Sequence, residues 1–234
     1  LFDLLGMDRA VDLPLVAYGV GGGAQMGRGT TLSLSVGAMR VEKLRTAILA
    51  LGPLAMRDGL SAPLILGQDL LGKTVLELDT VSHRLRFLRA EDHVPPTDAR
   101  PIRVSRSGTA LSTEVTVEGA TVQAVVDTGA SALLALGRDA AASAGLLDGR
   151  PTRRTSSIVL GGAIAAEVVQ ARTVTVGDRL YRDAEVPIYA NISLPGFPDA
   201  LLGMEAFEGR TLVMDLGRGQ LHVADGQGLR VEGY

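Results

Sequence analysis

Hydrophobic and polar positions alternate along much of the chain, which is the pattern of β-strands with one buried face. Residues 30–36 alternate in this way, residues 74–88 read as two strands joined by a turn, and residues 115–126 read as two short strands around a Glu-Gly turn. Residues 41–51 stay ambiguous, because their apolar positions also fit helical spacing, and residues 1–14 fit the tail of a helix. The pattern therefore predicts a mostly β protein.

The two halves of the chain resemble each other. Residues 66–87 align with residues 202–223 at a constant offset of 136, and both stretches begin with a Leu-Gly pair. Further upstream, the Val-Gly pair at 36–37 aligns with the pair at 176–177 at an offset of 140. This self-similarity predicts an internal duplication with small insertions.

The duplication predicts an all-β fold of two similar lobes. Each lobe is expected to be a small, partly closed β-barrel with a short helix after its Leu-Gly element. The first lobe spans residues 1–90, and the second spans residues 106–234. Residues 91–105 form the expected linker, because residues 91–98 are polar and rich in proline.

Composition excludes several classes of function. The chain has 23 basic and 26 acidic residues, no run of Lys or Arg and only 3% aromatic residues, so we expect no nucleic-acid partner. No apolar stretch reaches the roughly 18 residues that span a bilayer. There is no Cys, no Gly-x-Ser-x-Gly pattern and no cluster with the spacing of metal ligands, so we expect no metal and no cofactor. Because the sequence starts without Met, we expect a processed or truncated product.

The sequence Val125-Val126-Asp127-Thr128-Gly129-Ala130-Ser131 is the strongest candidate for chemistry. Two β-branched residues lead a buried strand into the aspartate, and the Thr-Gly pair that follows favours a tight turn. The carboxylate is thereby presented at the end of a rigid strand. A purely structural Asx-turn is the alternative interpretation.

This stretch resembles the active-site signature of the retropepsin/pepsin family of aspartic proteases, and most of all that of the bacterial retropepsin-like proteases. The second element of that signature follows 76 residues after Asp127, where Leu201-Leu202-Gly203 leads into a predicted short helix. The resemblance implies that Asp127 is one of two catalytic aspartates. It further implies that Gly129 lets the backbone approach the carboxylate, that Thr128 bonds the opposite lobe, and that Ser131 donates to the outer oxygen of Asp127.

The resemblance also implies a hairpin flap that closes over a peptide held as an added strand. The candidate flaps are residues 16–25 and 159–165. The candidate substrate-binding residues in them are Tyr18, Gly21, Gly22, Gly161 and Gly162. Half-buried packing is the alternative role for the tyrosine.

The chemistry requires a second carboxylate, because one must hold a proton while its neighbour is ionised. At an offset of 139, the first-copy counterpart of Asp127 lies about a dozen residues before Leu1. We therefore expect an aspartic endopeptidase whose second Asp is encoded upstream. The alternatives are an inactive peptide-binding module, or an active homodimer that pairs two copies of Asp127.

The expected partner is a peptide or protein substrate. The high Ala, Gly and Arg content without Cys suits a bacterial protein. Bacterial proteases of the kind that this chain resembles are often exported, which implies a periplasmic location.

Overall fold

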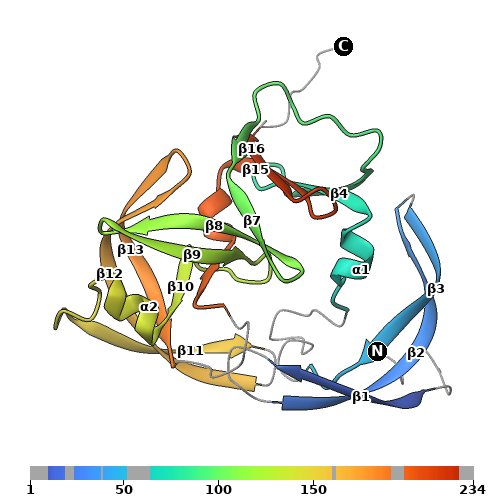
Figure 1. Cartoon of the computed structure of the whole chain (residues 1–234), viewed down its shortest axis with the longest axis horizontal. Coiled ribbons are helices and arrows are strands. Elements are labelled where there is room, and N and C mark those ends of the chain that lie inside the picture. The colour runs from blue at the N-terminus through green and yellow to red at the C-terminus, as the bar shows by residue number, and fades with distance from the viewer. Residues whose placement is uncertain are drawn as a thin grey trace. The chain divides into compact units, whose positions relative to one another are not determined.

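Strands make up most of the regular secondary structure, which confirms the predicted all-β class (Figure 1). The computed structural model describes residues 10–18, 24–37, 39–51, 64–159, 162–190 and 198–226. Within these ranges the strands form three sheets of three, eight and five strands. No helix in the described ranges has the length and apolar character needed to cross a membrane.

Residue contacts divide the chain into two compact units. Unit 1 comprises Leu1–Ile65 and Ser156–Ala165, and unit 2 comprises Leu66–Thr155 and Ala166–Tyr234. The lobe and linker boundaries expected from the sequence stay a prediction.

Unit 1 contains the three-stranded antiparallel sheet β1-β2-β3. Its strands are β1 (Val11–Tyr18), β2 (Ala24–Val36) and β3 (Met39–Ile48). The helix predicted for residues 1–14 is wrong for its last four residues, which belong to β1. The ambiguous stretch at 41–51 is largely strand β3.

A β-bulge explains why the apolar residues of β3 have a spacing that also fits a helix. Leu32 and Leu34 of β2 face Leu44 and Val41 of β3, so β3 carries one extra residue between its paired positions. Lys43 lies at this irregularity with a φ of 54°. The insertion shifts the apolar positions from a spacing of two to a spacing of three, which is also found on a helix face.

The eight-stranded sheet closes into a small barrel. Its order is β11-β12-β13-β10-β14-β9-β8-β7, and β12 pairs additionally with β8, so six strands form a closed ring. The strands are β7 (Val104–Ser107), β8 (Ala110–Val117), β9 (Ala120–Val126), β10 (Leu134–Gly137), β11 (Thr152–Val159), β12 (Gly162–Val176), β13 (Arg179–Tyr189) and β14 (Ala200–Leu202). The helix α2 (Arg138–Ser143) buries Ala141 against the same core. Alternate strand residues such as Val115, Leu134 and Val186 are fully buried in the core.

The five-stranded sheet has the order β5-β4-β15-β16-β6 and lies within unit 2. Its strands are β4 (Thr74–Asp79), β5 (Arg84–Arg89), β6 (Arg100–Ile102), β15 (Arg210–Asp215) and β16 (Gln220–Asp225). A short helix follows each Leu-Gly pair, as predicted: α1 (Gln68–Leu71) and the 3-10 helix η2 (Met204–Phe207). The bounds of α1, β4 and β5 recur in η2, β15 and β16 at the same offset of 136 that the sequence shows.

The two aspartates at equivalent positions in these hairpins are turn residues. Asp79 Oδ1 accepts hydrogen bonds from the backbone N–H groups of Val81 and Ser82, at 2.9 and 3.2 Å. Asp215 Oδ1 accepts the N–H of Arg218 at 2.8 Å in the equivalent turn. Both carboxylates complete hairpin turns, so their role in the described structure is structural.

Candidate active site

Asp127 follows directly after strand β9 and is held by a second strand. β9 pairs in parallel with β14, so that Val126 lies opposite Leu202. The N–H of Asp127 donates to the carbonyl oxygen of Leu202 at 2.9 Å. The position of the aspartate is therefore fixed by two strands that are far apart in the sequence.

The Asp-Thr-Gly sequence forms the tight turn that was predicted. The carbonyl oxygen of Asp127 accepts the N–H of Ala130 at 3.2 Å, and its Oδ1 accepts the N–H of Gly129 at 2.8 Å. A Cβ atom at position 129 would lie 3.1 Å from Oδ1, closer than most side chains tolerate. The Asx-turn and the catalytic interpretation are thus compatible, since the turn itself orients the half-buried carboxylate.

The Leu-Gly element encloses the loop that follows Asp127. Gly203 donates its N–H to the carbonyl oxygen of Leu133 at 3.1 Å, and Met204 donates to that of Ala130 at 2.8 Å. A Cβ atom on Gly203 would meet the carbonyl oxygens of Ala132 and Ala130 at 2.1 and 2.6 Å. Only glycine fits this close approach of two backbone segments.

Glu205 is a supporting residue that the sequence interpretation missed. Its Oε2 accepts the backbone N–H of Leu133 at 3.0 Å, which ties the helix η2 to the end of the Asp127 loop. Its position in the sequence, two residues after Gly203, could have indicated that Glu205 lies close to the Asp127 loop. Tyr181 of β13 supports the same helix, because its hydroxyl donates to the carbonyl oxygen of Ala206. Burial raises the pKa of this tyrosine above its usual value.

The other predicted site residues are only partly described. Thr128, Gly129 and Ser131 are exposed beside Asp127, and the roles expected for the two hydroxyl groups stay predictions. Tyr18 is the last residue of β1, opposite Ala24, and Gly162 is the first residue of β12. Gly21, Gly22 and Gly161 lie outside the described residues.

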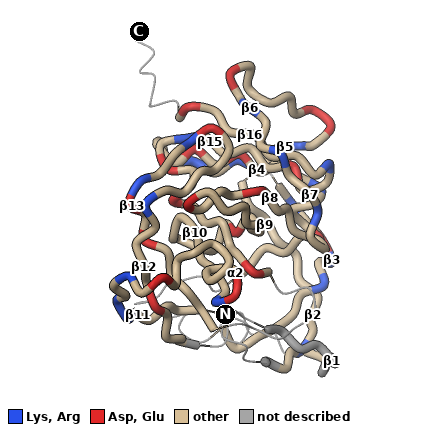
Figure 2. Tube along the Cα trace, turned by 60° about the vertical axis from the view of Figure 1, so that its left-hand side comes forward, with Lys and Arg blue, Asp and Glu red and all other residues tan. Residues whose placement is uncertain are grey.

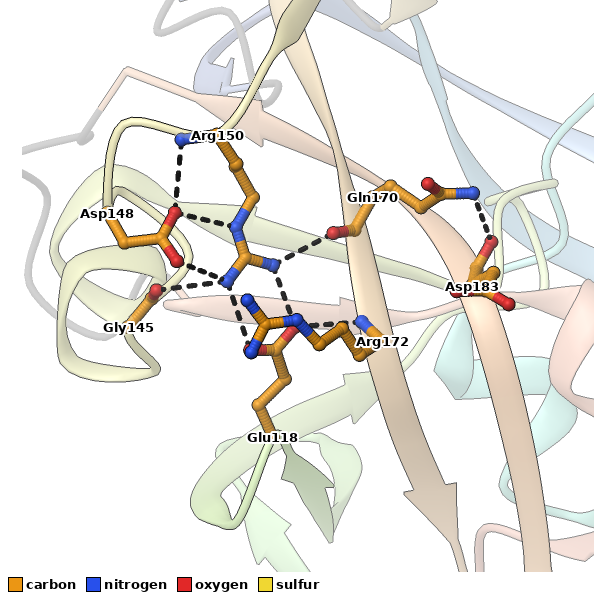
Figure 3. A network of polar contacts seen from close by, with 7 residues as sticks. All are labelled: Glu118, Gly145, Asp148, Arg150, Gln170, Arg172 and Asp183. Carbon is orange, nitrogen blue, oxygen red and sulfur yellow. Dashed lines mark hydrogen bonds and ion pairs between the residues drawn. The ribbon is translucent and has the colours of Figure 1, made fainter.

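A network of ion pairs holds the first end of strand β9, opposite to the end that leads into Asp127 (Figure 3). Glu118 and Gly119 form the β8–β9 turn with φ values of 48° and 92°. The Arg150 guanidinium donates to both carboxylate oxygens of Glu118 at 2.7 and 3.0 Å, and to both of Asp148 at 2.8 Å. It also donates to the carbonyl oxygen of Gln170 in β12 at 2.8 Å. One side chain therefore joins the β8–β9 turn, the loop after α2 and strand β12.

The network stabilises the ionised carboxylates. The Arg150 hydrogen bonds lower the pKa of Glu118 from 4.5 to about 2 against the opposing effect of burial, and the Arg172 N–H at 2.7 Å contributes. The same guanidinium lowers the pKa of Asp148. Within the described residues no group of three or more His, Cys, Asp or Glu side chains is arranged to hold a metal ion.

Comparisons with known proteins match the segment that carries this site to one family model. Residues 113–206, less than half of the chain, match the family model described as aspartyl protease. The matched segment includes both Asp127 and the Leu-Gly element. No curated protein sequence matches the chain.

Solved structures show distant similarity. A retropepsin-like aspartic protease from Rickettsia conorii is 24% identical over 53% of this chain and 89% of its own, with a TM-score of 0.40. Basic 7S globulin from soybean is 9% identical over 100% and 80% of the two chains, with a TM-score of 0.44. Conglutin gamma, a basic 7S globulin from lupine seeds, is 12% identical over 94% and 74%, with a TM-score of 0.45.

An Asp-Thr-Gly turn at the end of a barrel strand, enclosed by a Leu-Gly element, is the arrangement that the signature seen in the sequence predicts. Residues 113–206, which carry this arrangement, are similar to the aspartyl protease family. The resemblance seen in the sequence is confirmed.

Proposed function

We propose that this protein is an endopeptidase in which Asp127 activates a water molecule together with a second aspartate. The observation that carries the proposal is the placement of the Asp127 carboxylate, held by the Gly129 N–H at 2.8 Å at the end of β9. The family match over residues 113–206 supports a peptidase. The second aspartate is the one that the internal repeat predicts upstream of Leu1.

The proposed chemistry is general acid-base catalysis. One carboxylate of the pair takes a proton from the water while the other, protonated, polarises the peptide carbonyl. Because Oδ1 of Asp127 accepts the Gly129 N–H, we assign Oδ2 to the water. The substrate is proposed to be an extended peptide, read first through its backbone.

The test uses the full-length gene product, including the residues encoded before Leu1. Asp127→Asn keeps the size of the side chain, and we expect it to lower peptide cleavage by about 1,000-fold at mildly acidic and neutral pH. Asp98→Asn, in the exposed segment before β6, is the matched control and should leave cleavage unchanged. Undiminished cleavage in a folded Asp127→Asn variant would contradict the proposal.

The same assay separates the two alternatives. Peptide binding without cleavage in the unmodified protein would favour the peptide-binding module. Cleavage that rises with the square of the protein concentration would favour a homodimer that pairs two copies of Asp127.

We also propose that the protein acts outside the cytoplasm of a bacterium, and the support is the family resemblance alone. Fractionation of cells expressing the native gene would test this location.

A further inference from the structure

Two side chains of strand β13 hold the carbonyl end of the short helix η2. The Tyr181 hydroxyl donates to the carbonyl oxygen of Ala206, and the Arg179 guanidinium donates to that of Glu208 at 2.6 Å. The last carbonyl groups of a helix have no partner within the helix, so such donors determine how its end is held. The guanidinium carbon also lies 4.9 Å from the centre of the Tyr181 ring, so the two side chains support each other.

The start of β13 is itself fixed to the five-stranded sheet. Asp178, the residue before β13, pairs with Arg210 of β15 at 2.9 Å and with Arg100 of β6 at 2.6 Å. Figure 2 shows basic and acidic residues next to one another at this junction of β13 with β15. The two side chains that reach η2 therefore project from a fixed point.

The other end of η2 holds the loop that carries Asp127. Met204 donates its N–H to the carbonyl oxygen of Ala130 at 2.8 Å, and Glu205 accepts the N–H of Leu133 at 3.0 Å. Ala130 in turn donates its N–H to the carbonyl oxygen of Asp127 at 3.2 Å. A continuous series of hydrogen bonds thus runs from β13 through η2 to the aspartate.

Burial of Phe207 is the competing explanation for the position of η2. Phe207 is 1% exposed and belongs to the core, but one ring fixes a four-residue helix at a single point. The Thr80 hydroxyl lies 3.1 Å from the carbonyl oxygen of Phe207, yet it lies 2.8 Å from that of Arg210 and has only one hydrogen to donate. The two donors from β13 supply the further points of attachment.

We propose that Tyr181 and Arg179 are positioning residues for the proposed reaction, because they fix η2 against the Asp127 loop and so hold the carboxylate in the geometry that turnover requires. Their bonds go to η2 and to each other, so they act through the helix. A small displacement of a reacting group slows the chemical step more than it weakens binding of the peptide. This inference rests on the proposed function.

The test compares kcat and KM for peptide cleavage by variants of the full-length gene product. Tyr181→Phe removes the hydroxyl and keeps the ring, and Arg179→Met removes the donor and the charge. We expect each to lower kcat by about tenfold and to change KM by less than about twofold. Arg179→Lys retains a charge and a donor, and it should recover most of the lost turnover.

Thr113→Val is the matched control. It removes a bond of the same kind, from the Thr113 hydroxyl in β8 to the carbonyl oxygen of Arg103 at 2.9 Å, and should leave kcat unchanged. A fall in kcat as large as that of Tyr181→Phe would overturn the proposal, because any lost bond of the barrel would then have the same effect. An unchanged kcat in both Tyr181→Phe and Arg179→Met would also overturn it.

Hydrogen exchange, followed by NMR without substrate, gives a measurement that is independent of cleavage. In Tyr181→Phe and Arg179→Met the Ala130 and Met204 amides should exchange about fivefold faster. The Glu118 amide, which bonds the Thr173 carbonyl oxygen at 3.0 Å in the turn before β9, should exchange at an unchanged rate. Equal acceleration at all three amides would indicate a general loss of stability and would contradict a positioning role.

The two proposals fail in different ways. If the unmodified protein cleaves no peptide, the proposed function fails, and hydrogen exchange still decides whether β13 positions the Asp127 loop. If the unmodified protein and both variants cleave equally well, only the positioning role fails.

Discussion

Substituting Glu118 by glutamine should remove a pH-dependent part of the stability of the barrel. The Glu118 side chain is 14% exposed and the Arg150 side chain 12%, so water screens their contact little. Glutamine has nearly the same size but no charge, and it loses one of the two oxygens that face the guanidinium. The turn conformation and the packing around it should be preserved.

The magnitude follows from the lowered pKa of Glu118. A fall from 4.5 to about 2 corresponds to about 3 kcal/mol of extra stability when the carboxylate is ionised. Because the folded-state pKa is the lower one, this contribution is complete above pH 4.5 and is lost as the pH falls towards 2. At pH 7 we expect Glu118→Gln to lower the free energy of unfolding by about 2 to 3 kcal/mol.

The measurement is urea unfolding of both proteins at a series of pH values from 7 to 2.5. The difference in unfolding free energy should shrink steadily below pH 4.5. Part of the acid sensitivity should remain in the variant, because Arg150 also lowers the pKa of Asp148. Glu114→Gln, at an exposed position of the neighbouring strand β8, is the control and should change stability by less than about 0.5 kcal/mol. A difference between wild type and Glu118→Gln that stays constant from pH 7 to pH 2.5 would refute the reasoning.

Three further predictions concern the support of the Asp127 loop. Gly203→Ala should destabilise the protein by about 3 kcal/mol, because the new methyl group would overlap the carbonyl oxygens of Ala130 and Ala132; an unchanged melting temperature would contradict this close approach. Glu205→Ala should lower stability by about 1 kcal/mol and speed hydrogen exchange at the Leu133 amide, which NMR can follow; an unchanged rate would exclude the bond. Tyr181→Phe should cost about 1 kcal/mol in urea unfolding, since the carbonyl of the buried Ala206 loses its donor, and a neutral result would argue against that contact.

The sequence predicts those parts of the site that depend on local backbone chemistry. The Asp-Thr-Gly turn is encoded within a few residues, because Asp127 and Gly129 bond each other directly. The Leu-Gly element is recognisable because Gly203 has no tolerated substitute at its close contact.

Contacts between distant residues could not be predicted in the same way. Arg150 bonds Glu118 across 32 residues of sequence, and many surface Arg and Glu residues were equally plausible partners. The bulge at Lys43 altered the spacing of apolar residues in β3, so a strand imitated a helix. The pattern rules assume regular strands, and a single inserted residue breaks that assumption.

The pairing of Val126 with Leu202 has a consequence for how such a protein can vary. These neighbours in the sheet are separated by 76 residues, and the chain between them leaves the site, builds half of the barrel and returns. Since the entropy of closing a loop grows slowly with its length, turns along this excursion can gain or lose residues at little cost. The pairing of β9 with β14 that positions Asp127 should therefore tolerate insertions and deletions in these turns. Grafting a longer loop at the β12–β13 turn should leave the position of the carboxylate unchanged.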